Sequence, residues 1–459
     1  MLAPAAWTVA LASIVPGVVS LLLLWLGFRS LRRRRWLENV PTSKVEGVFL
    51  GLTELKGRAE RDPPLRSYLA ERETVYFRYS VEEQERRTET YTDSKGRLRT
   101  RTRTSWRVVQ SGEERPPFFL RDDTGALRID PEGAQIEAEQ IFSHTCGRSD
   151  PLYYAKGPSA AIAGSTHRRR FTESAISLHQ EIFVFGTARL RDDALEPEIC
   201  RDPDQDLFLV STRSEEQILR GYGWKALAAL VGGWLAGGAV PVAYEVSAHG
   251  ETIPDAIEGA AVVLLLVTGG YWVVALGLYL QLVYNGLVEV RHQMRRAFSM
   301  IDVELQRRRD LIPNLAQVVG AGAEHERRAH EVAAKLRGGF AAEAMPGAAD
   351  ARALSDLANS QTDALAGIFL HAEAHPELRT NEAFLRLSAE LARTERRIAL
   401  ARSFYNDTVT AYEDRVHTLP DLLFARAFGF DPVALLEIEP FERNPVEVRF
   451  EGASASTAP

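Results

Sequence analysis

Three long apolar segments that contain no charged residue constrain this chain more than any other feature of its sequence. They run from Leu2 to Phe28, from Ala226 to Tyr244 and from Gly259 to Val288. A helix of roughly 17 to 25 predominantly apolar residues crosses the hydrocarbon core of a bilayer. The sequence therefore predicts a multidomain membrane protein with three transmembrane helices, at residues 1–28, 226–244 and 259–283.

The first segment has the features of a retained membrane anchor and not of a cleaved signal peptide. No basic residue precedes it, and it is followed by Arg29 and the run from Arg32 to Arg35. A signal peptide needs a basic start and a cleavage site of small residues instead. We therefore expect the first helix to stay in the protein.

Basic residues indicate the orientation of the predicted helices. Arg29 and Arg32 to Arg35 follow the first segment. Arg213, Arg220 and Lys225 precede the second, and Arg291, Arg295 and Arg296 follow the third. The stretch between the second and third segments, Glu245 to Glu258, contains no lysine or arginine. Because cytoplasmic flanks carry an excess of these residues, we expect the amino terminus outside, both large soluble parts in the cytoplasm, and a bacterial inner membrane as the location.

The second apolar segment contains a pair of glycines at helical spacing. Gly233 and Gly237 form a small-xxx-small pattern. Such a pair lets another helix approach closely inside a bilayer. We therefore interpret both glycines as candidates for packing between transmembrane helices.

Residues 37–214 have the pattern of a β-rich domain. Short apolar and β-branched runs are bounded by turn residues, at Val45 to Leu52, Thr74 to Val81, Phe118 to Leu120, Ile182 to Phe185 and Leu207 to Val210. Asp123-Thr124-Gly125 and Asp130-Pro131-Glu132-Gly133 have the composition of turns. Their carboxylates are explained better by turn formation than by a metal.

Arginine and threonine alternate in one part of this domain. The arginines are Arg97, Arg99, Arg101, Arg103 and Arg107, and a period of two places them on one face of a strand. The preceding run carries Glu82, Glu83, Glu85 and Glu89. We favour a solvated hairpin with cross-strand ion pairs. The alternative is a basic ribbon that contacts anionic lipid.

Four segments of this region resemble the GIDE domain, the MULAN-type "beside a membrane" domain. They are Glu46 to Gly57, Pro64 to Tyr68, Tyr79 to Glu83 and Asp122 to Ala126. In eukaryotic members the domain lies between two membrane spans, and a RING finger that follows it carries ubiquitin ligase activity. No cysteine-rich module follows the second apolar segment here. The resemblance therefore implies the domain without RING-type ubiquitin transfer.

From residue 284 to residue 440 the pattern predicts an all-α bundle of long helices. The third apolar segment continues into a helix that Pro313 should kink or restart, with Asp310 as the cap. A second helix is predicted over 349–374. A third keeps a 3–4 spacing of apolar residues over about 35 residues, from Phe384 to Val416. A short helix near 422–428 precedes Gly429, and the tail at 441–459 is expected to be disordered.

Several motifs of this helical region resemble the LemA family closely. They are Tyr284-Asn285, Ile301 to Val303, Arg308 to Leu315, Thr380 to Glu382, Thr394-Glu395, Arg397 to Ala399, Ala401-Arg402, Tyr405-Asn406 and Gly429-Phe430. Family members are membrane proteins with a single span and a long-helix bundle, and they have no established enzymatic activity. The resemblance implies the same bundle here, preceded by two further spans and the GIDE-like domain.

Charged residues within these motifs form a candidate polar network between helices: Asp302, Arg308, Arg309, Asp310 and Arg397. Buried charges between helices usually fix register and orientation. We therefore favour a structural role for the network over a binding site.

We find no pattern that predicts catalysis, a metal or a cofactor. The chain has two cysteines, Cys146 and Cys200, and we expect two unrelated thiols. His325 and His330 resemble a zinc motif, but a spacing of five places them on different faces of a helix. The net charge of −7 argues against nucleic acid as a main partner, and no small-molecule substrate is identified.

We therefore predict a non-catalytic integral membrane scaffold that projects a helical bundle into the cytoplasm. Its expected partners are the lipid bilayer and either further copies of itself or other membrane proteins. One alternative is an accessory or regulatory subunit of a membrane protease or envelope-stress complex. The other is a protein similar to E3 ubiquitin ligases, which the missing RING finger disfavours.

Overall fold

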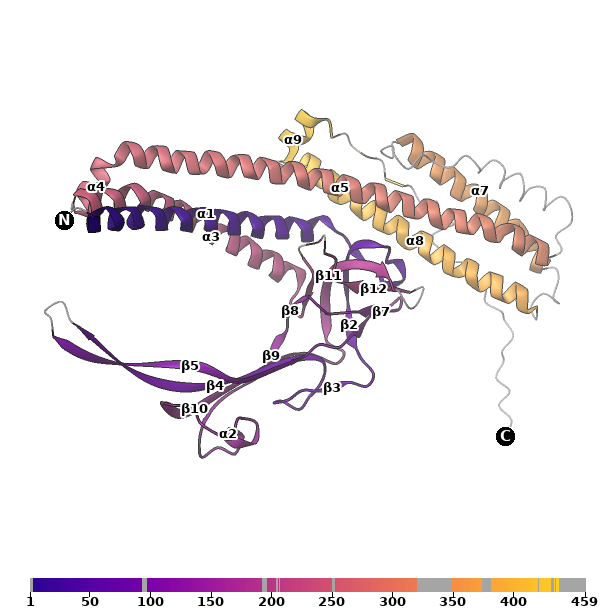
Figure 1. Ribbon diagram of the computed structural model, residues 1–459. Helices are drawn as coiled ribbons and strands as arrows, with labels where there is room; N and C mark the ends of the chain where they lie inside the picture. Colours follow the sequence, from indigo (N-terminus) through magenta and orange to yellow (C-terminus); the bar gives the residue numbers. More distant parts are fainter. Residues whose placement is uncertain are drawn as a thin grey trace. The chain divides into compact units, whose positions relative to one another are not determined.

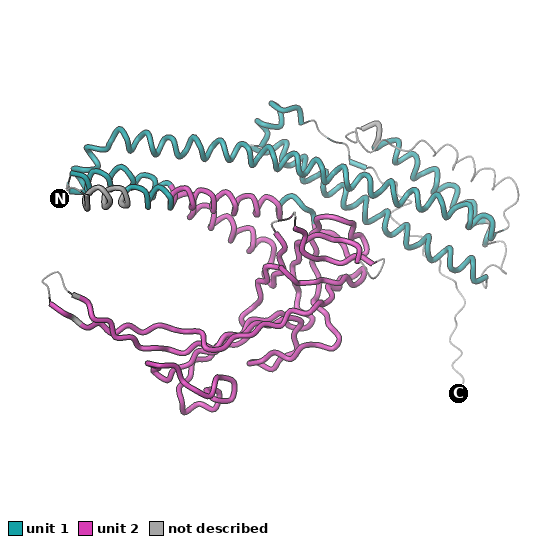
Figure 2. The backbone as a smooth tube through the Cα atoms, in the orientation of Figure 1, with its two compact units in different colours: residues 1–19, 38–41, 234–459 teal, residues 20–37, 42–233 magenta. Residues whose placement is uncertain are grey.

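The computed structural model describes residues 3–92, 97–191, 196–203, 205, 207–249, 252–319, 348–373, 381–419, 421–430, 433 and 435–436 (Figure 1). The chain forms two compact units (Figure 2). One comprises residues 1–19, 38–41 and 234–459, and the other comprises residues 20–37 and 42–233.

Three helices in the described part of the chain are long and apolar enough to cross a membrane. They are α1 (Ala3–Asn39), α3 (Glu215–His249) and α5 (Ala261–Val319). Apolar side chains on these helices, such as Leu21, Leu235 and Val273, are 60% or more exposed. The prediction of three apolar helices of spanning length is confirmed. The helices extend beyond the predicted spans, because α1 continues through the arginine run and α4 (Ile253–Gly259) occupies much of the expected loop.

Five strands of the β-rich region close into a small barrel. The closing order is β2 (Gly51–Glu60), β6 (Phe118–Arg121), β7 (Ala126–Ile129), β12 (Pro197–Cys200) and β11 (Glu181–Leu190), which pairs back with β2. The strands β1 (Thr42–Ser43), β13 (Leu209–Ser211) and β8 (Gln135–Glu137) extend the same sheet. Alternating residues such as Leu55, Phe118 and Ile129 are fully buried inside it. The barrel thus has its own apolar core.

A second sheet carries a long hairpin. It consists of β3 (Leu65–Arg66), β4 (Glu73–Thr92), β5 (Leu98–Glu114), β9 (Glu139–Gly147) and β10 (Ser165–Ser177), with the short helix α2 (Leu152–Ala155) beside β9. β10 covers β4 only between residues 74 and 85. Beyond that point β4 and β5 continue as a two-stranded ribbon, which Figure 1 shows as the extended arm of this sheet.

The predicted strand from Val45 to Leu52 is partly wrong. Val45–Gly47 forms a short 3-10 helix, η1, and β2 begins only at Gly51. The cause is a turn elsewhere in the chain, because Val45 N donates to Asp122 Oδ2 at 2.9 Å and Glu46 N donates to Thr124 Oγ1 at 3.0 Å. The Asp122 turn therefore binds the backbone groups that a strand would have used.

The helical region packs α5 with α7 (Ala348–Glu373), α8 (Glu382–His417) and α9 (Asp421–Phe428). All three predicted helices after α5 are confirmed. The apolar faces of α7 and α8 share a core with α5 that includes Ile312, Leu315, Leu365, Ile368, Phe384 and Leu391. The predicted restart at Pro313 is wrong, because α5 continues through it to Val319. The predicted cap Asp310 therefore lies within the helix, and Asn314 Nδ2 donates to its carbonyl oxygen at 3.3 Å.

Candidate functional site

A buried arginine on α5 binds both neighbouring helices of the bundle. Arg308 is 3% exposed, and its Nε lies 2.6 Å from Glu395 Oε1 on α8. Its Nη2 donates to Thr362 Oγ1 at 2.9 Å, and its Nη1 donates to Ala358 O at 3.3 Å, both on α7. Burial raises the pKa of the Glu395 carboxyl, and Arg308 and Arg402 oppose that rise. One side chain thus fixes α5 against two helices at once.

Two further ion pairs join α5 to α8. Arg397 Nε lies 2.9 Å from Glu304 Oε1, and Glu304 is 4% exposed. Arg307 Nη2 lies 3.1 Å from Glu390 Oε1 on the exposed side of the same interface. With Arg308, these contacts form a row along the bundle, which is the arrangement expected of a register device.

The structure places the five predicted network residues in two groups. Arg308 and Arg397 lie in the interface between helices. Asp302 and Arg309 are half-buried on the flank of α5, and Asp310 is exposed, 3.8 Å from Arg309 Nε on the same helix.

The acidic partners Glu304 and Glu395 were missed by the sequence analysis. Glu304 lies four residues before Arg308 and shares its helix face, which was a usable signal. Glu395 stands in a quoted family motif, but nothing in the sequence pairs it with Arg308.

The predicted hairpin is confirmed. The cross-strand ion pairs expected between its glutamates and arginines are not found among the described side chains. Glu89 lies opposite Arg101 and Arg87 lies opposite Arg103. Arg97, Arg101, Arg103 and Arg107 are exposed, and within the described residues the last three have no ion pair. Arg99 lies on β5, but its side chain is outside the described part.

Most of the expected acidic partners bind other arginines. Glu82 pairs with Arg170, and Glu85 pairs with Arg87 at 2.9 Å. Glu83 is fully buried and binds the fully buried Arg169, whose Nη2 lies 3.0 Å from Glu83 Oε2.

The Glu83–Arg169 pair is fully hydrogen-bonded. Arg169 also donates to the carbonyl oxygens of Tyr153, Pro158 and Ala160. Burial alone would raise the pKa of Glu83, but hydrogen bonds from Ser165, Arg169 and Tyr153 outweigh it and lower that pKa. This ion pair joins β4 to β10. Arg107 lies opposite Glu83 in the hairpin, but the Glu83 carboxylate is bound to Arg169 instead.

Both predicted packing glycines are buried on α3. The carbonyl oxygen of Gly233 accepts a hydrogen bond from Ser20 Oγ on α1 at 2.7 Å. Near Gly237, the ring of Trp234 on α3 lies 6.4 Å from the ring of Trp272 on α5. Contacts between these helices therefore occur within a single chain.

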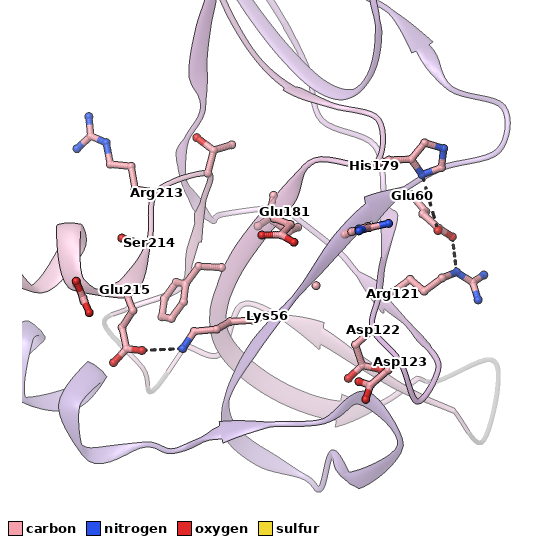
Figure 3. A pocket seen from close by; sticks show the side chains of 16 residues that line it. Lys56, Glu60, Arg121, Asp122, Asp123, His179, Glu181, Arg213, Ser214 and Glu215 are labelled. Atoms are coloured by element: carbon pink, nitrogen blue, oxygen red, sulfur yellow. Dashed lines mark hydrogen bonds and ion pairs between the residues drawn. The ribbon is translucent and has the colours of Figure 1, made fainter.

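A groove of about 1020 Å³ opens beside β2 and β11 at the start of α3 (Figure 3). Its lining mixes both signs of charge. Lys56 Nζ lies 2.8 Å from Glu215 Oε2, and Arg121 Nε lies 2.6 Å from Glu60 Oε2. The lining contains four lysine or arginine side chains and six aspartate or glutamate side chains, so its charge alone does not define a ligand.

Next to this groove, Glu54 is a buried carboxyl with a perturbed pKa. It is 1% exposed and accepts a hydrogen bond from Thr42 Oγ1 at 2.5 Å. Burial raises its pKa to about 7, with repulsion from Glu215 adding to the rise and the Thr42 hydrogen bond and Lys56 opposing it. Lys56 Nζ is 3.4 Å away but lies closer to Glu215. Burial therefore favours the protonated, neutral form of the Glu54 carboxyl.

The described residues contain no group of three or more His, Cys, Asp or Glu side chains that could hold a metal ion. Cys146 on β9 and Cys200 on β12 are buried free thiols. His325 and His330 lie outside the described residues.

Fold and sites together define a membrane protein with three apolar helices, a β-rich domain and a helical bundle. Two family models match the chain: the LemA family at residues 297–450, and GIDE, described as E3 ubiquitin ligase, at residues 86–240. Both matches confirm the resemblances that the sequence predicted, one for the helical region and one for the β-rich region. No curated protein matches it.

Proposed function

We propose that this protein is a non-catalytic membrane scaffold that projects a rigid helical bundle from the bilayer into the cytoplasm. One observation carries the proposal: α5 is a single helix of 59 residues from Ala261 to Val319. Its first part is an apolar span, and its last part lies in the bundle core. A helix without a break transmits its orientation from the membrane to the bundle.

The contacts of the bundle support this role. α8 packs along α5 through buried residues at the predicted spacing, among them Leu391, Ile398, Tyr405 and Tyr412. The ion pairs of Arg308 and Arg397 set the register of that packing. These contacts make the projecting part of α5 stiffer than an isolated helix of the same length.

Distance measurement across the bilayer boundary tests the proposal. Leu276 and Val303 are exposed on α5, and 27 residues of helix separate spin labels at these positions by about 40 Å. In the full chain in nanodiscs, with Cys146 and Cys200 changed to alanine, we expect a single narrow distance distribution. Insertion of four glycines after Gly286 provides the matched flexible control. A broad distribution without the insertion contradicts the scaffold.

The ligase-like alternative has less support in this chain. A RING-type module needs several cysteines, and the two cysteines of this sequence lie in different sheets of the β-rich region. The name of the GIDE family model is its only support.

Assembly state separates the remaining alternatives, because a scaffold built from copies of this chain should give one discrete oligomer by light scattering.

A further inference from the structure

The short helix α9 has an apolar face that the bundle leaves uncovered. At 100° per residue, Leu423, Ala427, Phe424 and Phe428 fall on one arc of about 140°. Leu423 is 63% exposed and Phe428 is 59% exposed. Phe424 and Phe428 stack with ring centroids 6.5 Å apart. Phe424 is half-buried. Asp421 and Ala425, which follow Phe428 around the helix at about 160° and 200° from Leu423, are buried.

Contacts with α5 place this face relative to the transmembrane segment. The rings of Phe428 and Phe430 lie 5.2 Å and 6.2 Å from the ring of Tyr284 on α5. Glu289 is the first charged residue of α5 after Ala261. Five residues of helix separate Tyr284 from Glu289, so Phe428 contacts α5 about 8 Å on the apolar side of the first charge. Figure 1 shows α9 beside this part of α5.

Charges near α9 match those of an interfacial helix. Arg426 is exposed at the flank of the apolar arc, and Arg291 Cζ lies 5.8 Å from the ring of Phe430. The single acidic residue of α9, Asp421, is buried. A helix that rests in a bilayer surface buries its apolar face about 5–10 Å deep and keeps basic residues at its edge.

We infer that α9 is an interfacial foot that inserts Leu423, Phe424 and Phe428 into the boundary between headgroups and acyl chains. The leaflet is the one from which α5 leaves the bilayer. The foot gives the bundle a second attachment to the membrane, beside the span itself, and so restrains its tilt. The inference needs α5 to cross the bilayer but does not depend on the scaffold role.

Lipid-borne quenchers test the foot directly. The full chain without its native cysteines is labelled with an environment-sensitive fluorophore at Leu423→Cys and reconstituted in phosphatidylcholine–phosphatidylglycerol nanodiscs. The matched control is Val303→Cys, an aliphatic position 62% exposed on α5. It lies 14 residues beyond Glu289, or about 21 Å along the helix. Phe428→Cys is the second test position if the first variant folds poorly.

We expect lipids with a shallow nitroxide to quench roughly half of the fluorescence at residue 423 and little at residue 303. Equal quenching of both probes by aqueous iodide would place the face in water and overturn the inference. Protection of residue 423 from both quenchers would mean that a second copy or another protein covers α9, which also overturns it. The spin-label distance within α5, measured on the doubly labelled chain in the same nanodiscs, shows separately whether the proposed function has failed.

Discussion

At the scale of single residues, Glu54 makes stability depend on pH. With its pKa raised to about 7 by burial, the folded chain keeps a proton between about pH 4.5 and 7 that the unfolded chain has released. Stability therefore falls as pH rises through that window, by about 3 kcal/mol for this group. We expect Glu54→Gln to flatten the dependence of the unfolding temperature on pH from 5 to 8. Glu60→Gln on the same strand should leave the slope in place, and an unchanged slope in Glu54→Gln would refute the assignment.

The buried Glu83–Arg169 pair predicts a large and asymmetric mutational effect. Arg169→Met leaves a buried carboxylate without its partner and should destabilise the β-rich domain by about 3–5 kcal/mol. Adding Glu83→Gln should recover much of that loss, since the isolated charge is then gone. Arg121→Met breaks an ion pair in which Arg121 is 55% exposed and should cost about 0–1 kcal/mol. Thermal unfolding in detergent compares the three, and equal effects of the two arginine variants would contradict this account.

At the scale of elements, the hairpin ribbon carries like charges that face each other. Arg87 and Arg103 are direct cross-strand neighbours, and such pairs are unfavourable. We expect Arg103→Glu to stabilise the domain by about 0.2–1 kcal/mol and to weaken contact of the ribbon with anionic lipid. Thr102→Glu, on the opposite face across from Thr88, is the control for added charge. Loss of stability in Arg103→Glu alone would show that the arginine is held by a contact that the register does not reveal.

The start of α8 explains one of the quoted family motifs. The side chain of Asn381 accepts hydrogen bonds from Ala383 N at 3.0 Å and Phe384 N at 3.1 Å. Asn381→Ala should therefore lower stability by about 1 kcal/mol, whereas Asn381→Asp should keep it. Thermal unfolding of both variants measures the difference, and similar midpoints would argue against a capping role.

Periodicity predicted the elements better than it predicted their contacts. The spacing from Phe384 to Val416 predicted α8 within a residue or two, because burial on one face leaves a strong local signal. The end of α9 was also readable, since Gly429 has a φ of +68° and Phe430 N donates to Ala425 O. The partners of Val45 and Arg308 are distant in sequence, so local patterns held no information about them. The α9 face was missed because its apolar residues look like ordinary core residues until exposure is known.

At the scale of the whole molecule, the side of the membrane on which each part lies decides among the proposed functions. The distribution of arginines predicts that the ribbon and the bundle share the cytoplasm and that residues 245–258 lie outside. A barrel beside one span and a bundle continuous with another then face the same compartment and the same partners.

Cysteine labelling of the full chain in cells tests this topology. Thr102, Asp255 and Ala399 are all exposed, so a reagent that reaches the right compartment should modify each of them. Added to intact cells, a maleimide that cannot cross the membrane should label Asp255→Cys and should spare Thr102→Cys and Ala399→Cys until the cells are opened. Labelling of residue 102 or 399 from outside would reverse the orientation. Labelling of residue 399 from outside would also remove the cytoplasmic leaflet as the site of the α9 foot, because α9 and residue 399 belong to the same bundle.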